Sequence, residues 1–557
     1  MRCFCVVIIL KPHYLYVNVN MFSASLMLAD MDYIAPSQAC IKPAMTKAAQ
    51  ATSSGTVYRH GDADAPPPEI LKISLQDCLA CSGCVTSAET MLVTNQSKEE
   101  LLTTLSATEK HVVVTISEQS AASIAVQLGS TVQAAYDVIA RFARSVIRAE
   151  YVLGLEWAQH AALQLTAAEY LQRVATAPET LPMIVSSCPG WVCYCEKQYP
   201  ELLPHLSRVM SPQGIAGSLL KRVIGGGNTT SSLESVYHVS IQPCFDRKLE
   251  AARDGEAAVS EEEAVGVRYT DCVLSSHEVL EWMTEIAAAA SSTPVMQWGP
   301  ESTVHGLDAA PTIERRDDNA RPTVPADDNE EGRKDSDELT ALQGSGGYHQ
   351  HVLTAAAQQC VGRGAFSWST ATFETKRNAN HRLIRTPVDA QLSLPQPLPS
   401  NGAKQHLFCI AYGFQHIQNI VRGLRKRLST TPLYTFIELM ACPSGCLNGG
   451  GQVRTSSHEE TLTSVRRVFV EHRAGGLCGP PHDSTATNDE EDHSTESPIA
   501  KVPRTERTSS HQIEGILSGA LLHNDAVAMT FVTTQFHDRK KEMEEILKAN
   551  PMHSLKW

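Results

Sequence analysis

The chain has 557 residues, of which 42% are hydrophobic, and it carries a formal net charge of -14 at pH 7. This length accommodates two or more domains, and this composition can fill their cores. The acidic balance argues against a nucleic-acid partner bound through a basic surface. The sequence has no uninterrupted apolar run of about 18 residues, which argues against a membrane-spanning helix.

The N-terminal residues do not read as a secretory signal. The apolar stretch from Phe4 to Leu10 is short, Lys11 follows it at once, and no small-residue cleavage site is evident. We interpret residues 1–20 as an upstream extension of the gene model, so that the protein begins at Met21. Residues 21–105 then form a first segment, which contains a Pro-, Gly- and Ser-rich loop from about residue 45 to 68.

Alternating strand and helix patterns follow this segment. The β-branched run His111–Ile116 predicts a strand, Ser117–Ser120 reads as a polar turn, and a helical pattern runs from Ala121 to Arg148. Further strands are predicted at Met183–Val185, Val236–Ile241 and Leu407–Tyr412, the last followed by a helix at Gln415–Leu428. This alternation indicates an α/β fold.

Two polar segments interrupt the pattern. Residues 301–340 contain 12 acidic and five basic residues, a net charge of -7 and half that of the whole chain. We predict disordered inserts at residues 295–347 and 479–511. They divide the rest of the chain into a first lobe at 106–294, a second lobe at 348–478 and a C-terminal segment at 512–557.

A first set of cysteines lies before the first lobe. Cys78, Cys81 and Cys84 are spaced three residues apart, so that one loop can wrap a cube of iron and sulfide. Cys40 is available as a distant fourth ligand. Structural zinc usually takes two C-x2-C pairs rather than a triple, and disulfides do not suit this spacing in a large chain without a signal peptide. The pattern therefore favours a 4Fe-4S cluster over zinc.

A second set of cysteines is spread over three separated segments, two of which follow predicted strands. Its members are Cys188, Cys244, Cys442 and Cys446. Single cysteines are commonly buried structural thiols. The C-x3-C pair is different, because Gly445 and Gly449–Gly451 flank it and small residues let backbone amides approach sulfur. The second set therefore also predicts a four-thiolate site.

Apart from Cys3 and Cys5 in residues 1–20, six further cysteines stand alone or follow Trp191, and we predict that they pack as small hydrophobic residues. They are Cys193, Cys195, Cys272, Cys360, Cys409 and Cys478. His406 and His416 are expected to be core or surface residues rather than metal ligands.

Several segments resemble known signatures. Ser186–Trp191, Pro243–Glu250 and Glu438–Gln452 resemble the three signatures of iron-only hydrogenases. They are more similar still to the Nar family of cytosolic iron-sulfur assembly factors, which are hydrogenase-like and nuclear prelamin A recognition factor-like. Ile34–Pro43 resembles the N-terminal cluster segment of that family, and Thr270–Glu278 resembles another of its blocks. The resemblance covers the chain from residue 21 onward, apart from the two inserts.

The resemblance implies a two-lobed iron-only hydrogenase-like α/β core with an N-terminal iron-sulfur segment and disordered inserts. It assigns two sets of 4Fe-4S ligands: Cys40, Cys78, Cys81 and Cys84 for an N-terminal cluster, and Cys188, Cys244, Cys442 and Cys446 for a buried one. It implies a non-catalytic carrier, cytoplasmic with a nuclear pool. Such a carrier passes clusters from early scaffold NTPases, through a targeting complex that contains a WD-repeat protein, to apo iron-sulfur proteins.

Departures from the hydrogenase signatures bear on activity. Hydrogenases have two adjacent cysteines where this chain has Ser187 and Cys188, and a lysine where Arg247 stands, although Lys248 is adjacent. Losing that thiol and shifting that amine would remove a proton relay and a cyanide-anchoring group. The non-catalytic carrier is therefore the preferred function. The alternative function is an oxidoreductase with a di-iron centre, and the third candidate is a zinc-stabilised interaction protein. Residues 151–173 resemble neither group clearly.

The chain ends on an aromatic residue, Trp557. A terminal tryptophan offers a large apolar anchor for a partner's pocket, although it is also a common packing residue. It resembles the Trp-ended tails by which the family docks to the targeting complex, with Lys556 in place of the usual acidic or small polar residue.

Overall fold

A computed structural model describes most residues in the ranges 96–252, 267–298, 343–385, 406–427 and 434–474, with isolated positions near 93 and at 532–541. The predicted insert at 479–511 and most of that at 295–347 lie outside these residues. The chain forms two compact units. The larger comprises Gln96–Trp191 and Glu201–His537, and it holds all the strands described below.

The first sheet of the larger unit has four parallel strands in the order β2-β1-β4-β5. The strands are β1 (His111–Ile116), β2 (Tyr151–Gly154), β4 (Val236–Gln242) and β5 (Cys272–Ser275). Val114 lies opposite Val152 on one side and Val239 on the other. All seven residues of β4 are buried, as expected of a parallel sheet covered on both faces.

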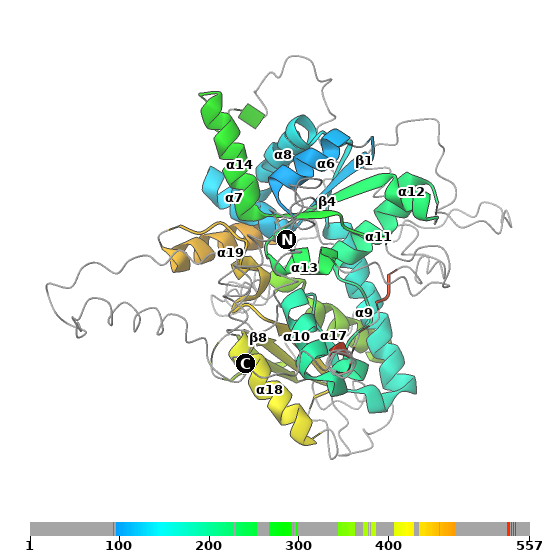
Figure 1. Ribbon diagram of the computed structural model, residues 1–557. Coiled ribbons are helices and arrows are strands. Elements are labelled where there is room, and N and C mark those ends of the chain that lie inside the picture. The colour runs from blue at the N-terminus through cyan, green and yellow to red at the C-terminus, as the bar shows by residue number, and fades with distance from the viewer. Residues whose placement is uncertain are drawn as a thin grey trace, which may run out of the picture. The chain divides into compact units, whose positions relative to one another are not determined.

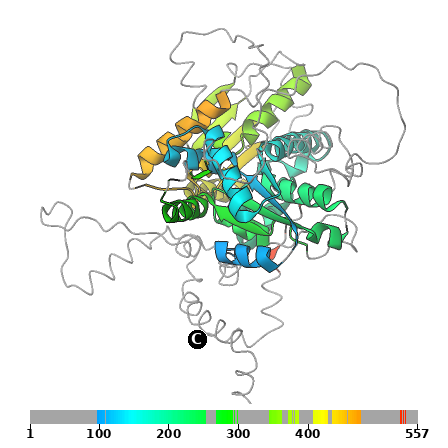
Figure 2. The ribbon, with the colours of Figure 1, turned by 90° about the horizontal axis from the view of Figure 1, so that it is seen from above.

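Helices pack around this sheet (Figure 1). They are α6 (Lys98–Ala107), α7 (Glu118–Leu128), α8 (Val132–Phe142), a π-helical turn at Ala143–Ile147, α11 (Pro212–Gly225), α12 (Thr230–Glu234), α13 (Asp246–Ala252), α14 (Ser276–Ala289) and α19 (His458–Ala474). Figures 1 and 2 both show α19 beside α7, which it contacts although more than 300 residues separate them. Phe142 anchors the core here, with Trp282 and Trp298 edge-on to it at centroid distances of 5.2 and 5.3 Å.

The start of α7 corrects one prediction. The residues Ser117–Ser120 are not a turn, because Ser117 is the N-cap of α7 and its side chain accepts a hydrogen bond from the Ser120 N–H. The helical pattern expected from Ala121 to Arg148 is also divided. Gly129, with φ +61°, ends α7 in the left-handed conformation, and α8 begins three residues later.

The second sheet has five strands in the order β3-β9-β8-β7-β6. They are β3 (Met183–Val185), β6 (Thr372–Thr375), β7 (His381–Arg385), β8 (Leu407–Tyr412) and β9 (Phe436–Met440). β3, β9 and β8 are parallel, while β7 and β6 form an antiparallel extension. The helices of this part are α9 (Glu156–Thr176), α17 (Tyr348–Val361) and α18 (Phe414–Arg427). Short 3-10 turns lie at Pro178–Thr180, Pro200–His205, Gln343–Ser345 and Gly445–Asn448.

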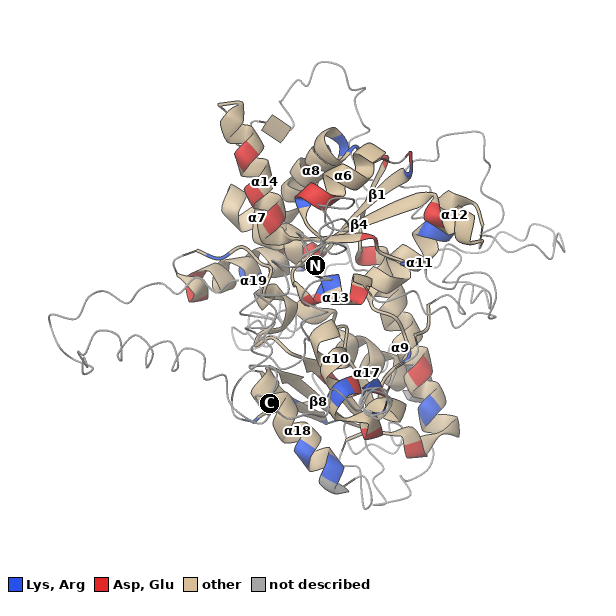
Figure 3. Ribbon diagram, viewed as in Figure 1, with Lys and Arg blue, Asp and Glu red and all other residues tan. Residues whose placement is uncertain are grey.

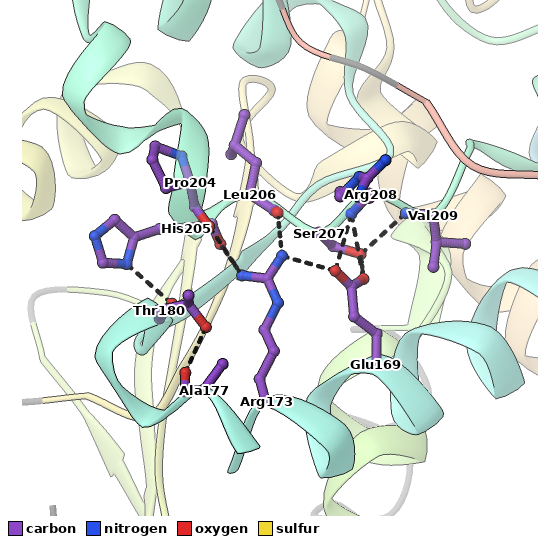
Figure 4. Close-up of polar contacts among 10 residues, drawn as sticks. All are labelled: Glu169, Arg173, Ala177, Thr180, Pro204, His205, Leu206, Ser207, Arg208 and Val209. Carbon is purple, nitrogen blue, oxygen red and sulfur yellow. Dashed lines mark hydrogen bonds and ion pairs between the residues drawn. The ribbon is translucent and has the colours of Figure 1, made fainter. Parts of the chain in front are cut away.

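Residues 151–173, which resemble neither the iron-only hydrogenases nor the Nar family clearly, form β2 and most of α9. Tyr170 packs edge-on against Phe408 of β8 and Phe436 of β9, at centroid distances of 5.6 and 5.8 Å. One turn later, Arg173 pairs with Glu169 at 2.7 Å. Figure 4 shows these two side chains reaching the segment that leads to α11.

The arginine and the carboxylate divide the polar groups of that segment between them. The Arg173 guanidinium donates to the carbonyl oxygens of Pro204, His205 and Leu206. Glu169 accepts hydrogen bonds from the Ser207 hydroxyl and the Arg208 N–H (Figure 4). Backbone groups that a buried loop would leave unpaired are therefore satisfied by one helix face.

The smaller unit is described mainly by Val192–Pro200, which includes most of helix α10 (Pro189–Gln198). Within it, Tyr194 and Tyr199 pack edge-on at 5.4 Å, and the Cys195 thiol lies 3.7 Å from the Tyr199 carbonyl oxygen. In the part of the chain that the structure describes, no helix is both long and apolar enough to span a membrane.

Candidate metal centre

The second set of cysteines lies where parallel strands end. Cys188 is the third residue after β3, and Cys244 and Cys442 are each the second residue after β4 and β9. The carboxyl ends of parallel strands are where α/β folds place their ligand sites. Cys446 follows Cys442 within the same loop. The set therefore draws on both sheets of the larger unit.

The four thiols are neighbours in space. Cys188 interacts electrostatically with Cys446, and Cys244 interacts with both Cys442 and Cys188. Cys188 is 7% exposed, and the other three are partly exposed. The first set, Cys40, Cys78, Cys81 and Cys84, lies outside the described residues.

Burial determines the protonation of these thiols. Burial raises the pKa of Cys188 to about 12. The Asp246 carboxylate raises this pKa further, whereas backbone hydrogen bonds from Ala441 and Trp191 lower it. Burial and then Asp246 raise the pKa of Cys244 far above its usual range, and burial raises that of Cys446. Such thiols become thiolates only when a positively charged centre binds them, so loading this site releases protons.

The loop from Cys442 to Cys446 has an unusual backbone. Ser444 and Gly445 both adopt left-handed conformations, with φ of +62° and +72°. The Ser444 N–H donates to Asn380 Oδ1 at 2.7 Å, and the Cys446 N–H donates to Ser345 Oγ at 3.0 Å. A side chain at position 445 would place its Cβ 1.8 Å from Ser345 Oγ, so only glycine fits there.

The glycine run after Cys446 has a different role from the predicted one. The N–H groups of Gly445, Gly449 and Gly451 donate to carbonyl oxygens rather than to sulfur, with acceptors at Cys442, Cys446 and Pro243. A Cβ at position 449 would lie 2.2 Å from the Pro243 carbonyl oxygen. These glycines therefore let the loop after β9 pack directly on the segment that carries Cys244.

The donor set has the chemistry of an iron-sulfur site. Four thiols converge from three loops, and electrostatic interactions link Cys188 with Cys446 and Cys244 with Cys442 and Cys188. Cysteine thiolates are the usual ligands of iron-sulfur clusters. Cys188, Cys244, Cys442 and Cys446 are therefore the residues that would hold such a cluster.

The residues that depart from the hydrogenase signatures lie at this site. The Ser187 hydroxyl points to Met440 Sδ at 3.9 Å, and Arg247 pairs with Glu250 at 2.6 Å. Lys248 is directed elsewhere, to Glu278 at 2.7 Å and to the Gln96 carbonyl oxygen at 2.8 Å. Figure 3 shows that basic and acidic positions lie next to each other on α13. The adjacent lysine therefore does not replace the shifted amine.

A buried network behind Cys446 is absent from the sequence predictions. Glu438 of β9 accepts hydrogen bonds from the His349 N–H at 2.8 Å and from the Tyr412 hydroxyl at 2.8 Å, and it pairs with His349 Nδ1 at 2.6 Å. Both His349 and Glu438 are 0% exposed. A carboxylate in the middle of the apolar strand Phe436–Met440 is the one signal that could have revealed it, because buried charges need partners.

The other predicted cysteines and histidines are buried where they are described. Cys193, Cys195, Cys272 and Cys409 are buried, as are His406 and His416. His406 Nδ1 lies 2.7 Å from the Tyr170 hydroxyl, which makes it a core residue. Cys478, Trp557 and the Cys360 side chain lie outside the described residues.

Comparisons with known proteins agree with this architecture. Residues 110–450 match the family model described as iron only hydrogenase large subunit, C-terminal domain. "Cytosolic iron-sulfur assembly component 3" of Rattus norvegicus is 35% identical over 476 residues, which cover 80% of this chain and 88% of that protein. A "probable cytosolic Fe-S cluster assembly factor" of Anopheles gambiae is 32% identical over 521 residues, covering 90% of this chain and 99% of its own length.

Among solved structures, an FeFe-hydrogenase from Chlamydomonas reinhardtii is 20% identical, with a TM-score of 0.47, and covers 67% of this chain and 88% of that chain. The matches to the family model and to the two curated relatives each span well over half of the chain. The chain therefore belongs to the Nar family of cytosolic iron-sulfur assembly factors, built on the iron-only hydrogenase large-subunit fold.

Proposed function

We propose that this protein is a non-catalytic carrier in cytosolic iron-sulfur protein assembly that binds two 4Fe-4S clusters and helps transfer clusters to apoprotein targets. The observation that carries the proposal is the convergence of four buried or half-buried thiols at the carboxyl ends of β3, β4 and β9. The relatives named as cytosolic assembly components support the cellular role.

The two clusters would use separate ligand sets. Cys188, Cys244, Cys442 and Cys446 would hold the second cluster, which supplies a stable four-thiolate centre between the loops of the two sheets. Cys40, Cys78, Cys81 and Cys84 would hold the first cluster. We infer that the first is exchanged and the second is structural, because burial protects the second from solvent and partners.

The proposed route has named classes of partner. Early scaffold NTPases would supply clusters, and a targeting complex that contains a WD-repeat protein would receive the loaded protein together with apo iron-sulfur proteins. Trp557 would dock to that complex as an apolar anchor. Cluster transfer would take place in the cytosol, as the names of the relatives suggest. We also predict a nuclear pool of the protein, which cell fractionation would test.

The alternative is an iron-only hydrogenase-type oxidoreductase with a di-iron centre. Two contacts weigh against it. Ser187 stands where a proton-relay thiol is expected and faces Met440, and Arg247 is tied to Glu250 while Lys248 faces Glu278. Infrared bands of bound carbonyl and cyanide in the purified protein would support the alternative over the carrier.

Metal content tests the proposal directly. The protein, purified anaerobically, should contain about eight iron and eight acid-labile sulfide per chain, the sum of two cubane clusters. Cys442→Ala should reduce both to about four, and Cys409→Ala, which changes a buried cysteine remote from the set, should leave them unchanged. Zinc without sulfide would overturn the assignment of all eight ligands.

Delivery assays test the division between the clusters and the docking tail. Cys81→Ala and Cys442→Ala should both lower the iron content of the protein. When each variant is loaded with clusters and mixed with an apo target, only Cys81→Ala should fail to transfer a cluster. Equal loss in both variants would refute the division. Deletion of Trp557 should weaken capture by the targeting complex without changing iron content, and unchanged capture would remove the docking role.

A further inference from the structure

A patch of arginines lies where α8 runs into the π-helical turn Ala143–Ile147. Its members are Arg141, Arg144 and Arg148, which are spaced three and four residues apart and so follow one another on successive turns. Arg148 ends the π-helical turn in the left-handed conformation, with φ of +59°. It lies three residues before β2, at the amino ends of the parallel strands, whereas Cys244 follows the carboxyl end of β4. The arginine patch is therefore separate from the candidate metal centre.

The positive charge of the arginine patch is not neutralised by its surroundings. Burial lowers the pKa of the half-buried Arg144, the charge of Arg141 lowers that pKa further, and the weaker influence of Asp137 raises it. Repulsion within the patch thus exceeds the attraction of the nearby carboxylate. Glu150 pairs with the first residue of β1 at 2.7 Å. Among the described residues, neither Arg144 nor Arg148 forms an ion pair or a side-chain hydrogen bond, so the patch favours a negatively charged ligand.

The chain enters its acidic insert from this same turn. Trp298 is 2% exposed and packs edge-on against Phe142 at a centroid distance of 5.3 Å. Its indole N–H donates to Ser145 Oγ at 3.0 Å, and its carbonyl oxygen accepts a hydrogen bond from Arg141 at 2.9 Å. Residues 299–342 follow and lie outside the described residues. The insert is therefore tethered beside the arginine patch at its first residue.

The densest acidic run of this insert is Asp327–Glu331, which has four carboxylates in five residues and no basic side chain. It begins 29 residues after Trp298 and ends 12 residues before Gln343. The carbonyl oxygen of Gly344 accepts a hydrogen bond from Gln119 at 3.0 Å, near the carboxyl end of β1. Twelve extended residues span about 40 Å, whereas a strand of six residues spans about 20 Å. The run can therefore reach the amino ends of the sheet from both of its tethers.

We propose that Asp327–Glu331 docks on Arg144 and Arg148, so that the acidic insert folds back on the first lobe. Each guanidinium can hold a carboxylate through two parallel N–H···O bonds. The tether keeps the local concentration of the acidic run on the order of millimolar, whatever the concentration of the protein. The pairs are partly exposed, so the docking weakens as salt is added. This inference does not depend on the proposed function, because it involves none of the cysteine loops.

Carbodiimide cross-linking of the full-length, anaerobically purified protein tests the docking. Arg148→Lys keeps the charge and supplies an amine, which a zero-length carbodiimide couples to a carboxylate in contact with it. Mass spectrometry of the monomer should find position 148 joined to a carboxylate of Asp327–Glu331. Arg467→Lys, at an exposed position of α19, is the matched control and should give far less of this product.

Three results of this experiment would overturn the proposal. The first is a cross-link from position 148 only to the second acidic run of the chain, Asp489–Asp492. The second is a cross-link to Asp327–Glu331 only in covalent dimers, which would mean that the run of a second copy occupies the patch. The third is an equal yield of the product from positions 148 and 467.

Trypsin gives a second measurement that needs no added amine. Arg333 and Lys334 closely follow the acidic run, so docking should slow cleavage after them. The double change Arg144→Gln with Arg148→Gln should speed this cleavage at least about threefold at low salt, where exposed ion pairs are least screened.

The control for this measurement is the double change Arg466→Gln with Arg467→Gln, which removes two exposed arginines of α19 and should leave the cleavage rate unchanged. In about 1 M salt, where the Debye length is about 3 Å, the unaltered protein should be cut as fast as the variant that lacks Arg144 and Arg148. Equal rates in the two double variants at low salt would overturn the docking, as would a difference that persists in high salt.

Discussion

The Ser345 hydroxyl accepts a hydrogen bond from the backbone N–H of Cys446 at 3.0 Å, across 101 residues of sequence. Ser345 is buried and immediately precedes the Gly346–Gly347 step into α17. On the other side of the same loop, Asn380 receives the Ser444 N–H. The C-x3-C loop is therefore held in its left-handed conformation by two residues from separate parts of the second sheet region.

Ser345→Ala should loosen this loop. Removing the hydroxyl leaves the Cys446 N–H without its acceptor, a loss of about 1–3 kcal/mol in the free energy of unfolding. We expect faster iron loss to a chelator as well as a lower urea midpoint. Ser106→Ala is the control, because the Ser106 hydroxyl also hydrogen-bonds a backbone group, in this case as a donor to the Leu102 carbonyl oxygen, but lies exposed on α6. The same rate of iron loss in both variants would contradict this role for Ser345.

Glu438→Ala should destabilise the protein more strongly. Its carboxylate is the common acceptor for His349 and Tyr412, and all of these contacts are buried. Removing one partner of a buried charged network costs about 3–5 kcal/mol. Glu438→Gln keeps the shape and one acceptor and should lose clearly less, as chemical denaturation would show.

Glu471→Ala serves as the control for this change, because Glu471 is exposed on α19. Surface substitutions usually change stability by less than about 0.5 kcal/mol. A Glu438→Ala variant that unfolds at the same denaturant concentration as Glu471→Ala would show that the buried network is energetically neutral.

The parts of the fold that the sequence predicted are those with a strong local pattern. β1, β3, β4 and β8 are β-branched or apolar runs, and their predicted bounds agree with the structure to within one residue. β2 is a run of only four residues that ends in Gly154, and β9 contains Glu438 in its centre. Neither has the uniform pattern that marks a buried strand.

The candidate site likewise has features that the sequence predicted and features that it did not. Cysteine spacing is local information, and the loops that carry Cys188 and Cys244 follow strands as expected. The C-x3-C pair follows β9, a strand that was not predicted. Ser345 and Asn380 lie 101 and 64 residues from their loop partners, and nothing in their own neighbourhoods indicates that role. Their contribution depends on strand order in the second sheet, which sequence periodicity does not determine.

Arg173→Lys should be a damaging change despite its preserved charge. The planar guanidinium donates to three successive carbonyl oxygens and to Glu169 (Figure 4), and a lysine ammonium cannot reproduce this fork. We expect a loss of about 2–3 kcal/mol in unfolding free energy, because buried carbonyl oxygens lose their donors. Arg467→Lys, at an exposed position of α19, should show no comparable loss. If the two variants are equally stable, Arg173 does not hold the segment that leads to α11.

The buried histidine His238 gives stability a defined pH dependence. Its Nε2 lies 2.9 Å from Thr115 Oγ1 and its Nδ1 lies 3.1 Å from the Tyr269 carbonyl oxygen, in the centre of the first sheet. Burial lowers the pKa of His238 to about 4 in the folded protein, against the opposing effects of Tyr269 and Asp271. The unfolded chain has a histidine pKa of about 6.5.

The sign follows from these two values. Above about pH 6.5 both states hold a neutral ring and stability does not depend on this group, whereas between about 6.5 and 4 only the unfolded chain takes up the proton, so stability falls as the pH falls. From about pH 7.5 to pH 4.5 the loss attributable to His238 is about 2.5 kcal/mol. His238→Asn should lower the free energy of unfolding at pH 7.5, but the further decline of this free energy down to pH 4.5 should be smaller by the amount attributable to His238. His458→Asn, at an exposed position of α19, should leave the decline unchanged. Acid also releases iron-sulfur clusters, so the unfolding free energies of each variant and of the unaltered protein are compared at the same pH and the same iron content. If the stability of His238→Asn declines as much as that of the unaltered protein, His238 is not the group that titrates.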